Sequence, residues 1–189
     1  MENIDVNNLY LKENDDMHTL DYNPSHNKEI KIKLLRDNAR IPTIATTGSA
    51  AYDLYVSAFI TEDGKYITDD TVIKLSKDHT TCLKCATGIA VEIPEGYCAL
   101  ILPRSGLAIK ENITVSNSPG LIDSDYRGEI IVGLIKHHTY NNSKDSYIHI
   151  GDRVAQMLIV KYNEFALNEV NELSSTYRGE NGFGSTGNS

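Results

Sequence analysis

Residues 81–102, TCLKCATGIAVEIPEGYCALIL, contain the pattern from which the fold class follows. Apolar and β-branched residues run through 81–92 and again through 97–102. Between the two runs, Pro94-Glu95-Gly96 has the composition of a turn. Runs of this length, bounded by turn residues, are typical of β-strands. The stretch therefore predicts a strand, a turn and a second strand.

The same pattern continues on both sides of this stretch. Residues 28–35 alternate Ile and Leu with Glu and Lys, which predicts a half-buried strand. Only 105–112, SGLAIKEN, is predicted to be helical. Short strands at regular spacing without βαβ alternation predict an all-β, jelly-roll-like antiparallel barrel or sandwich with one short helix. The other predicted strands are 52–58, 71–75, 113–115, 129–135, 147–150, 154–161 and one near 165–173.

The length of 189 residues suits one domain with a proper core. Residues 1–27 are polar, rich in Asn and Asp, and predict a mobile N-terminal extension. Residues 28–173 hold the predicted strands and form the expected β domain. Residues 174–189 are predicted to be a flexible, glycine-rich C-terminal arm.

Composition and charge exclude several classes of protein. The formal net charge of −8 argues against a nucleic-acid partner, because counterion release rewards basic surfaces. A small phosphorylated ligand is compatible with it, since local Arg groups and backbone amides dominate a pocket. No apolar run approaches the ~20 residues that a membrane helix needs. The N-terminus does not resemble a signal peptide, so we expect an intracellular, cytoplasmic protein, or also a nuclear one in a eukaryote.

The cysteines and histidines do not predict a metal site built by the protein. Cys82 and Cys85 form one CxxC, but a zinc site needs a second pair of ligands and Cys98 supplies one thiol. The histidines show neither HxxxH nor HExxH spacing. A buried pair of thiols on a strand is the expected interpretation of the CxxC.

The segment 120–130, GLIDSDYRGEI, places chemical groups between two apolar runs. Its pattern predicts a β-hairpin whose tip carries Asp123 and Tyr126. A carboxylate on rigid strands can act as a general base, and an aromatic ring can pack against a cyclic substrate. The alternative is a polar turn without function, which Gly, Asp and Ser commonly build.

The segment 178–187, RGENGFGSTG, has four glycines in ten residues. It cannot form a core and would become ordered only against a ligand or another surface. An arm that closes over a nucleotide explains its chemistry: Arg178 for phosphate, Phe183 for base stacking, Ser185 and Thr186 for phosphate oxygens. The alternative is a flexible tail. The Lys of a phosphate-binding GxxxxGK[ST] loop is missing.

Five segments in order resemble the motifs of the trimeric all-β deoxyuridine triphosphatases (dUTP diphosphatases). The resemblance covers the chain from about residue 28 to residue 187, which is nearly everything after the extension. The five segments are GSAAYDL at 48–54, PRSGLA at 103–108, the segment 120–130, GDRVAQML at 151–158 and the segment 178–187.

This resemblance implies an activity: hydrolysis of dUTP to dUMP and pyrophosphate, which limits uracil incorporation into DNA and supplies dUMP for thymidylate synthesis. Asp123 would be the general base that activates water for attack at the α-phosphorus. Mg²⁺ would be held mainly by the triphosphate, with no direct protein ligand and with Asp53 reaching it through water. A homotrimer with shared active sites is also implied, in which the arm of one subunit closes a site between two others.

The resemblance also implies the substrate-binding residues. Arg104, which would pair with Asp53, binds phosphate together with Ser105, Gly106 and Gln156. Tyr126 would lie against the deoxyribose and exclude a 2′-hydroxyl. Uracil would be recognised by Asn117, Gly120 and Ile122, and the arm would contribute Arg178, Phe183, Gly184, Ser185 and Thr186.

Some assignments have structural alternatives. Ser105 can instead cap a helix over 106–112, and Asp125 and Arg153 are expected to be structural, Arg153 as an ion-pair partner. The sequence departs from the family pattern at Ala51, where glycine is usual, and in its N-terminal extension. A positive φ at Ala51 would cost free energy.

Two rival functions remain open. A deoxycytidine triphosphate deaminase has a related fold but needs a group that protonates the ring. A nucleotide sensor would keep the pocket without turnover, and fold alone does not exclude it.

Overall fold

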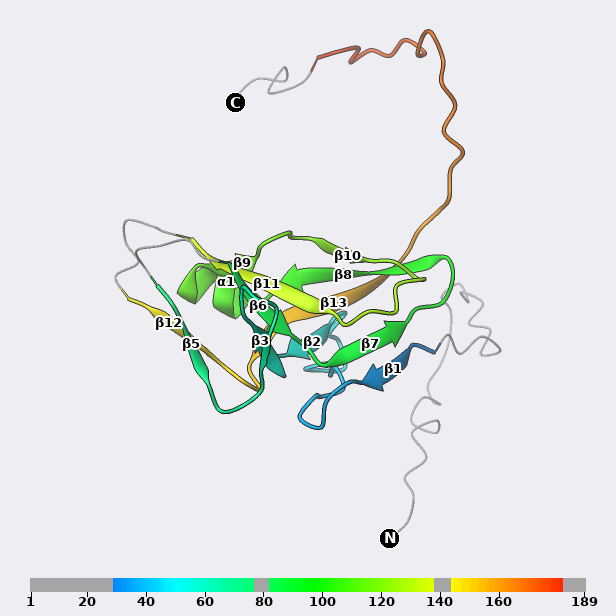
Figure 1. Cartoon of the computed structure of the whole chain (residues 1–189). Coiled ribbons are helices and arrows are strands. Elements are labelled where there is room, and N and C mark those ends of the chain that lie inside the picture. The colour runs from blue at the N-terminus through cyan, green and yellow to red at the C-terminus, as the bar shows by residue number, and fades with distance from the viewer. Residues whose placement is uncertain (1–28, 77–81, 138–143, 182–189) are drawn as a thin grey trace, which may run out of the picture.

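The computed structural model describes residues 29–76, 82–137 and 144–181, and the description below is confined to them. Within these residues the chain forms thirteen strands and one short helix (Figure 1). The elements are β1 (Lys31–Leu34), β2 (Tyr52–Tyr55), β3 (Ala58–Ile60), β4 (Tyr66–Ile67), β5 (Val72–Leu75), β6 (Cys82–Ala86), β7 (Ile89–Glu92), β8 (Tyr97–Pro103), α1 (Ser105–Glu111), β9 (Ile113–Val115), β10 (Gly120–Ile122), β11 (Ile131–Lys136), β12 (Ser146–His149) and β13 (Arg153–Lys161).

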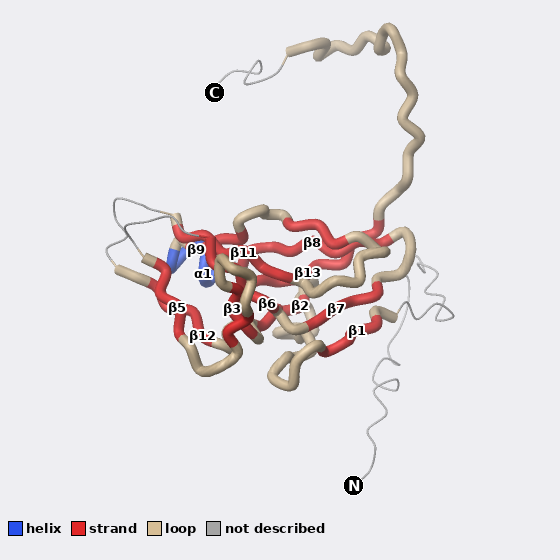
Figure 2. Tube along the Cα trace, in the orientation of Figure 1, coloured by secondary structure: helices blue, strands red, loops and turns tan. Residues whose placement is uncertain are grey.

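The strands pair antiparallel in two larger sheets and two smaller ones. One larger sheet has the order β10-β8-β13-β2 and the other β4-β3-β6-β11-β9. The strands β1 with β7, and β12 with β5, form the smaller pairs. Figure 2 shows strands throughout the body of the molecule and helix only in α1. The predicted all-β antiparallel class with one short helix is confirmed.

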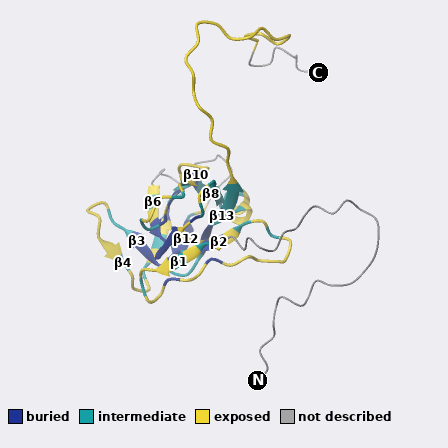
Figure 3. Cartoon of the chain, turned by 90° about the vertical axis from the view of Figure 1, so that its right-hand side faces the viewer, coloured by how far each residue is buried: buried dark blue, intermediate teal, exposed yellow. Residues whose placement is uncertain are grey.

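The core gathers apolar side chains from both larger sheets. Leu54 of β2, Phe59 of β3, Val132 of β11 and Met157 of β13 are each at most 2% exposed. In Figure 3 the buried segments lie inside the body, and exposed residues form its edges and the C-terminal extension. Burial of this apolar surface drives folding and holds β8 and β13, the longest strands, in a fixed register.

Two predicted strands are each divided in the structure. The run 52–58 becomes β2 and β3, because the chain passes from one large sheet to the other at Val56 and Ser57. The run 81–92 becomes β6 and β7 because Gly88 breaks it with a φ of +74°. A Cβ at Gly88 would lie 2.5 Å from the Ala39 Cβ, so only glycine fits this close approach.

The hairpin predicted over 120–130 is wrong. β10 pairs with β8, whereas β11 pairs with β6 and β9, so the segment between them crosses from one sheet to the other. Backbone bonds fix its second end, since Ile130 N–H donates to the Ile89 oxygen at 3.0 Å. The chemical groups of 123–128 therefore lie on a connection between sheets rather than at a hairpin tip.

The strand predicted near 165–173 is also absent from the described chain. Phe165 is 78% exposed, Leu167 98% and Leu173 89%. These residues form part of a segment that leaves the end of β13 and runs away from the body (Figure 1). An extended segment needs a neighbouring strand for its backbone bonds, and the single chain supplies none here. No helix in the described ranges has the length and apolarity that crossing a bilayer requires.

Candidate active site

Three charged side chains meet where β2, β8 and β13 lie side by side. Arg104 directly follows β8, and its Nε donates to Asp53 Oδ1 at 3.0 Å. Arg153, the first residue of β13, donates from Nη1 to Oδ2 of the same carboxylate at 2.9 Å. The Asp53 side chain is only 10% exposed, so two guanidinium groups hold a carboxylate that is nearly removed from water. We call these three residues, with Gln156, the arginine end of β8.

Gln156 completes the arginine end. The strand register places it opposite Asp53 on one side and Leu102 on the other. Its Nε2 donates to the Pro103 carbonyl oxygen at 2.9 Å, directly before Arg104. The predicted Arg104–Asp53 pair and the predicted structural ion pair of Arg153 are both confirmed.

Helix α1 begins at the same end of β8. Its first residue is Ser105, and its N-cap is Arg104, which has an extended backbone and no side-chain capping bond. The alternative that Ser105 caps the helix is therefore wrong. The first amides of a helix have no intrahelical partner, and the first turn of α1 carries no acidic residue. Ser105 and Gly106 are both exposed, so this turn is open to an anionic oxygen.

The far end of α1 is fixed by a buried lysine. Lys136, on β11, is 1% exposed, and its Nζ donates to the Glu111 carbonyl oxygen at 2.5 Å and to Ser146 Oγ at 2.8 Å. Burial lowers the pKa of Lys136, and the nearby Glu111 carboxylate opposes that shift. A cation at the last carbonyls of a helix also complements its dipole. The direction of α1 is thus set by the five-stranded sheet.

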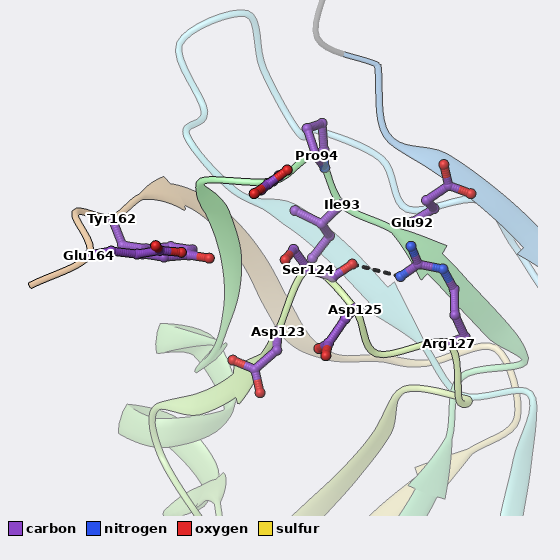
Figure 4. Close-up of a pocket in the computed structure, with 10 residues that line it drawn as sticks. Glu92, Ile93, Pro94, Asp123, Ser124, Asp125, Arg127, Tyr162 and Glu164 are labelled. Carbon is purple, nitrogen blue, oxygen red and sulfur yellow. Dashed lines mark hydrogen bonds between the residues drawn. The ribbon is translucent and has the colours of Figure 1, made fainter. Parts of the chain in front are cut away.

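Asp123 lies elsewhere, directly after β10 and exposed to solvent. Figure 4 shows it beside a cavity of about 720 Å³. Five carboxylates and one guanidinium are among the lining side chains, so this cavity in a single chain does not suit a triphosphate. The cavity is lined by Glu92, Ile93, Pro94, Glu95, Asp123, Ser124, Asp125, Arg127, Tyr162 and Glu164. β10 runs antiparallel to β8 and ends opposite Ala99, near the start of β8. We therefore call residues 123–128, which follow β10, the carboxylate end of β8.

Bonds among residues 123–128 themselves shape the carboxylate end. Tyr126 N–H donates to the Asp123 carbonyl oxygen at 3.2 Å. Arg127 Nη1 donates to the carbonyl oxygens of Ser124 at 2.6 Å and Tyr126 at 3.0 Å, the first of which Figure 4 draws. The Tyr126 side chain folds back over Gly128, where a Cβ would lie 2.3 Å from its hydroxyl oxygen. Asp125 is exposed, and its role as a structural residue stays a prediction.

Asn117 and Gly120 are brought together between the two ends. Gly120 is buried and pairs with Ile101 in the middle of β8. A Cβ at Gly120 would lie 3.3 Å from both Asn117 Nδ2 and the Ile101 Cβ. The side-chain amide of Asn117 therefore lies over the Gly120 backbone, and a larger residue there would push against it.

One chain does not bring Asp123 to the arginine end. Ile122 pairs with Ala99, so Asp123 follows next to Cys98, five residues along β8 from Pro103. At the rise of a β-strand, five residues span about 17 Å. The structure thus unites Asp53, Arg104, Arg153 and Gln156, and keeps Asp123 and Tyr126 apart from them.

Several predicted residues lie at or beyond the limit of the described chain. Arg178 is exposed, and its Nε donates to the Asn181 oxygen at 2.9 Å, within the C-terminal segment that runs away from the body (Figure 1). Phe183, Gly184, Ser185 and Thr186 lie outside the described residues. Ala51 shows no backbone strain: within the described ranges, Asn112 is the sole non-glycine residue with positive φ.

The buried thiol pair predicted for the CxxC is wrong. Cys82 is exposed and Cys85 buried, because residues three apart on a strand point to opposite faces. Burial raises the pKa of the Cys85 thiol. In the part of the chain that the structure describes, no group of three or more His, Cys, Asp or Glu side chains is placed to hold a metal ion.

The sequence did not predict the contacts around residues 123–128. Arg36 and Glu129 form an ion pair although they are 93 residues apart, and no local pattern indicates that distance in sequence. Tyr162 and Glu164 line the cavity at the carboxylate end, where the sequence predicted only the approach to a final strand. Lys136 lies one residue beyond the predicted strand 129–135, and no local pattern indicated its burial.

Comparisons with known proteins find relatives over most of the chain. The family model described as dUTPase matches residues 37–187. A deoxyuridine 5'-triphosphate nucleotidohydrolase of Hydrogenobaculum sp. is 43% identical, over 84% of this chain and 98% of that protein. One from Rickettsia typhi is 44% identical, over 84% and 97%. Among solved structures, a Staphylococcus bacteriophage 80alpha dUTPase with dUpNHpp is 28% identical, covers 84% of this chain and 98% of that one, and has a TM-score of 0.67.

Proposed function

This chain belongs to the dUTPase family, and on that premise we propose that it hydrolyses dUTP to dUMP and pyrophosphate with Asp123 as the general base. The observation that carries the proposal is the arginine end of β8. There one carboxylate fixes Arg104 beside an amide side chain and the open first turn of a helix. These are donors suited to a chain of phosphate groups.

The arginine end binds and orients the triphosphate. Arg104 is 26% exposed in its side chain, so its guanidinium is oriented by Asp53 while part of it faces solvent. Ser105, the amide of Gly106 and Gln156 add donors to phosphate oxygens. Arg104 Nη1 also donates to the Arg153 carbonyl oxygen at 2.9 Å. Because Asp53 and this carbonyl hold Arg104 before substrate arrives, little side-chain entropy remains to be lost on binding.

Asp123 accepts the proton of the attacking water. The new bond forms between that water oxygen and the α-phosphorus, and the bond from the α-phosphorus to its bridging oxygen breaks, so that pyrophosphate leaves. Asp123 is exposed, and its backbone is fixed by β10 and by the Tyr126 amide. A well-placed general base contributes about 10²–10⁴-fold in rate.

The uracil ring and the deoxyribose are recognised by residues between Asn117 and Tyr126. The backbone groups of Gly120 and Ile122, with the Asn117 amide, form the donor and acceptor edge for uracil. Cytosine reverses that edge and leaves buried groups unpaired, and the methyl group of thymine overpacks the site at a cost of about 1–3 kcal/mol. Tyr126 lies against the deoxyribose, where a 2′-hydroxyl would meet the ring.

Mg²⁺, when bound to the triphosphate, neutralises its charge and fixes the conformation of the phosphate chain. The donor set of the arginine end fits this arrangement. Each oxygen of Asp53 already accepts one guanidinium bond and keeps a lone pair for a metal-bound water. Asp53 is therefore assigned to water-mediated contact, with Arg104 and Arg153 as its direct partners.

A complete site takes residues from several copies of the chain. Asp123 lies next to Cys98, about 17 Å along β8 from Pro103 and farther still from Arg104, which is too far for one nucleotide α-phosphate to reach both within one chain. A homotrimer supplies Asp123 from a second copy and Arg178, Phe183, Gly184, Ser185 and Thr186 from a third. The exposed apolar residues Phe165, Leu167 and Leu173 suit a segment that packs on a neighbour.

The remaining assignments follow from this proposal. Residues 28–173 form the catalytic domain, 174–189 the closing arm and 1–27 an extension outside the catalytic machinery. The acidic balance of the chain supports a free nucleotide as the partner rather than nucleic acid. An intracellular, cytoplasmic location suits an enzyme that acts on nucleotides for DNA synthesis.

The test is pyrophosphate release from dUTP with Mg²⁺, beside dCTP, dTTP and UTP, with ammonia monitored. We expect pyrophosphate from dUTP at a kcat/KM far above that for the other three nucleotides. Ammonia from dCTP would assign the chain to the deaminases. Tight dUTP binding without turnover would make it a sensor, and either result would overturn the proposal.

A further inference from the structure

The ring of Tyr126 is held by Gly128 and Glu129, the second and third residues after it in the chain. It folds back over Gly128, where a Cβ would lie 2.5 Å from the ring carbon Cζ. Its hydroxyl donates to the carbonyl oxygen of Glu129 at 3.1 Å. The position of the ring therefore depends on the position of the Glu129 backbone.

Glu129 is held by charge and by a backbone amide. Its Oε1 forms an ion pair with the Arg36 guanidinium and accepts a bond from Gly88 N–H at 2.6 Å. Only 9% of the Glu129 side chain is exposed, and 19% of Arg36. Arg36 is itself fixed, since its Nε donates to Ser57 Oγ at 3.0 Å. Such a largely buried, charge-assisted pair restrains both partners more than a surface pair does.

The chain after Glu129 is equally firm. Ile130 is completely buried, and its N–H donates to the Ile89 oxygen at 3.0 Å. Its own carbonyl accepts bonds from Thr87 N–H at 3.2 Å and from Thr87 Oγ1 at 2.7 Å. Residues 129–130 are thus held rigidly. The loop 123–128 before them is mostly exposed and bonded mainly to itself.

We propose that Glu129, held by Arg36, is a positioning residue that fixes the Tyr126 ring and thereby sets the discrimination between deoxyribose and ribose. The proposal rests on the proposed function, in which Tyr126 lies against the sugar. Excluding a single hydroxyl by contact requires a ring that does not move away, and the Glu129 carbonyl is its anchor. If Glu129 is held less firmly, the Tyr126 ring can move, and the site then accepts the 2′-hydroxyl of a ribose.

The test compares kcat/KM for dUTP and UTP in Glu129→Gln. The amide keeps the volume of the side chain and an acceptor for Gly88 N–H, but it removes the charge that holds Arg36. We expect the dUTP-to-UTP ratio to fall about tenfold, mainly through a gain with UTP, as a steric contact relaxes. The kcat for dUTP should stay within about threefold of the wild type, because Asp123 and the arginine end are unchanged.

Two further variants separate positioning from general damage. Tyr126→Phe removes only the hydroxyl that bonds Glu129 and should lower the same ratio; it also carries the test if Glu129→Gln does not fold. The matched control is Asp63→Asn, which replaces an exposed carboxylate that is paired with Lys65 near β4. That variant should keep the wild-type ratio.

An unchanged ratio in both Glu129→Gln and Tyr126→Phe would overturn the inference. If Tyr126→Ala then lowers the ratio while those two do not, the ring still faces the sugar, and the proposed function stands without this inference. If Tyr126→Ala also leaves the ratio unchanged, the role of the ring in the proposed function falls together with the inference.

Discussion

The two ends of β8 differ in how firmly their side chains are held by partners within a single chain. At the arginine end, a nearly buried carboxylate binds two guanidinium groups, and Gln156 is bonded to the backbone beside them. At the carboxylate end, Asp123 and Asp125 are exposed, and the loop that carries them is bonded mainly to itself.

This difference separates two tasks. The donors at the arginine end must be fixed before a highly charged substrate arrives, so the fold gives them partners. Among the described residues, Asp123, the proposed base, is free of such partners, which suits a group that takes a proton from water. Changes at the arginine end should therefore affect stability and binding together, whereas a change of Asp123 at the carboxylate end should affect turnover alone.

The largest expected effect is that of Asp123→Asn. The amide cannot accept the proton of the attacking water, so kcat should fall by about 10³-fold with KM nearly unchanged. Because Asp123 is exposed, the free energy of unfolding should change by less than about 0.5 kcal/mol. Steady-state kinetics and urea unfolding measure the two quantities. Full activity in this variant would contradict the assignment of the base.

Removal of residues 178–189 should have the next largest effect. The closing arm would be lost, and turnover of dUTP should fall by about 10²-fold or more because water and substrate are no longer held in place. None of the described residues up to Asn181 in this segment is buried, so the melting temperature should not change. A truncated enzyme that keeps wild-type kcat/KM would show that the segment is a tail.

Asp53→Asn should produce the mixed effect that is expected of the arginine end. Arg104 and Arg153 lose their shared anion, so the free energy of unfolding should fall by about 2 kcal/mol. The KM for dUTP should rise about tenfold because Arg104 is no longer oriented. The change in stability distinguishes this variant from Asp123→Asn. If both variants proved equally stable, the contrast between the two ends would be wrong.

The smallest expected effect concerns Glu92, which lines the cavity at the carboxylate end and pairs with Lys31. The bond to Lys31 lowers the pKa of Glu92, and the bond to Glu92 raises the pKa of Lys31. The stabilising contribution of this pair is therefore lost as pH falls through the lowered Glu92 value, and lost as pH rises through the raised Lys31 value.

Thermal melts of Glu92→Gln across pH measure this contribution. We expect a slightly lower melting temperature than the wild type at pH 7 in low salt, and no difference in high salt, because the pair is exposed and screened. A large loss that salt does not reduce would mean that Glu92 supports the fold in another way.

The sequence predicted where the strands lie better than it predicted which strands pair with one another. Alternation and β-branched residues mark β8 and β13 within a residue or two, because those signals are local. The segment 120–130 was predicted as a hairpin, but its strands join different sheets, and pairing across sheets leaves no local trace.

For the site, the motif residues were predictable and their supports were not. The Arg104–Asp53 pair followed from the resemblance, whereas the Arg36–Glu129 pair joins residues 93 positions apart. The distance between Asp123 and Arg104 along β8 follows only from the strand register.

The central claim is that Asp123 and Arg104 act in one site from different copies of the chain. It is tested most directly by mixing two inactive variants, Asp123→Asn and Arg104→Ala, refolded together in equal amounts. In a symmetric oligomer with shared sites, about one site in four then receives both intact residues, so activity should recover to about a quarter of the wild type. A mixture no more active than the two separate variants would show that each chain works alone, and would contradict the account.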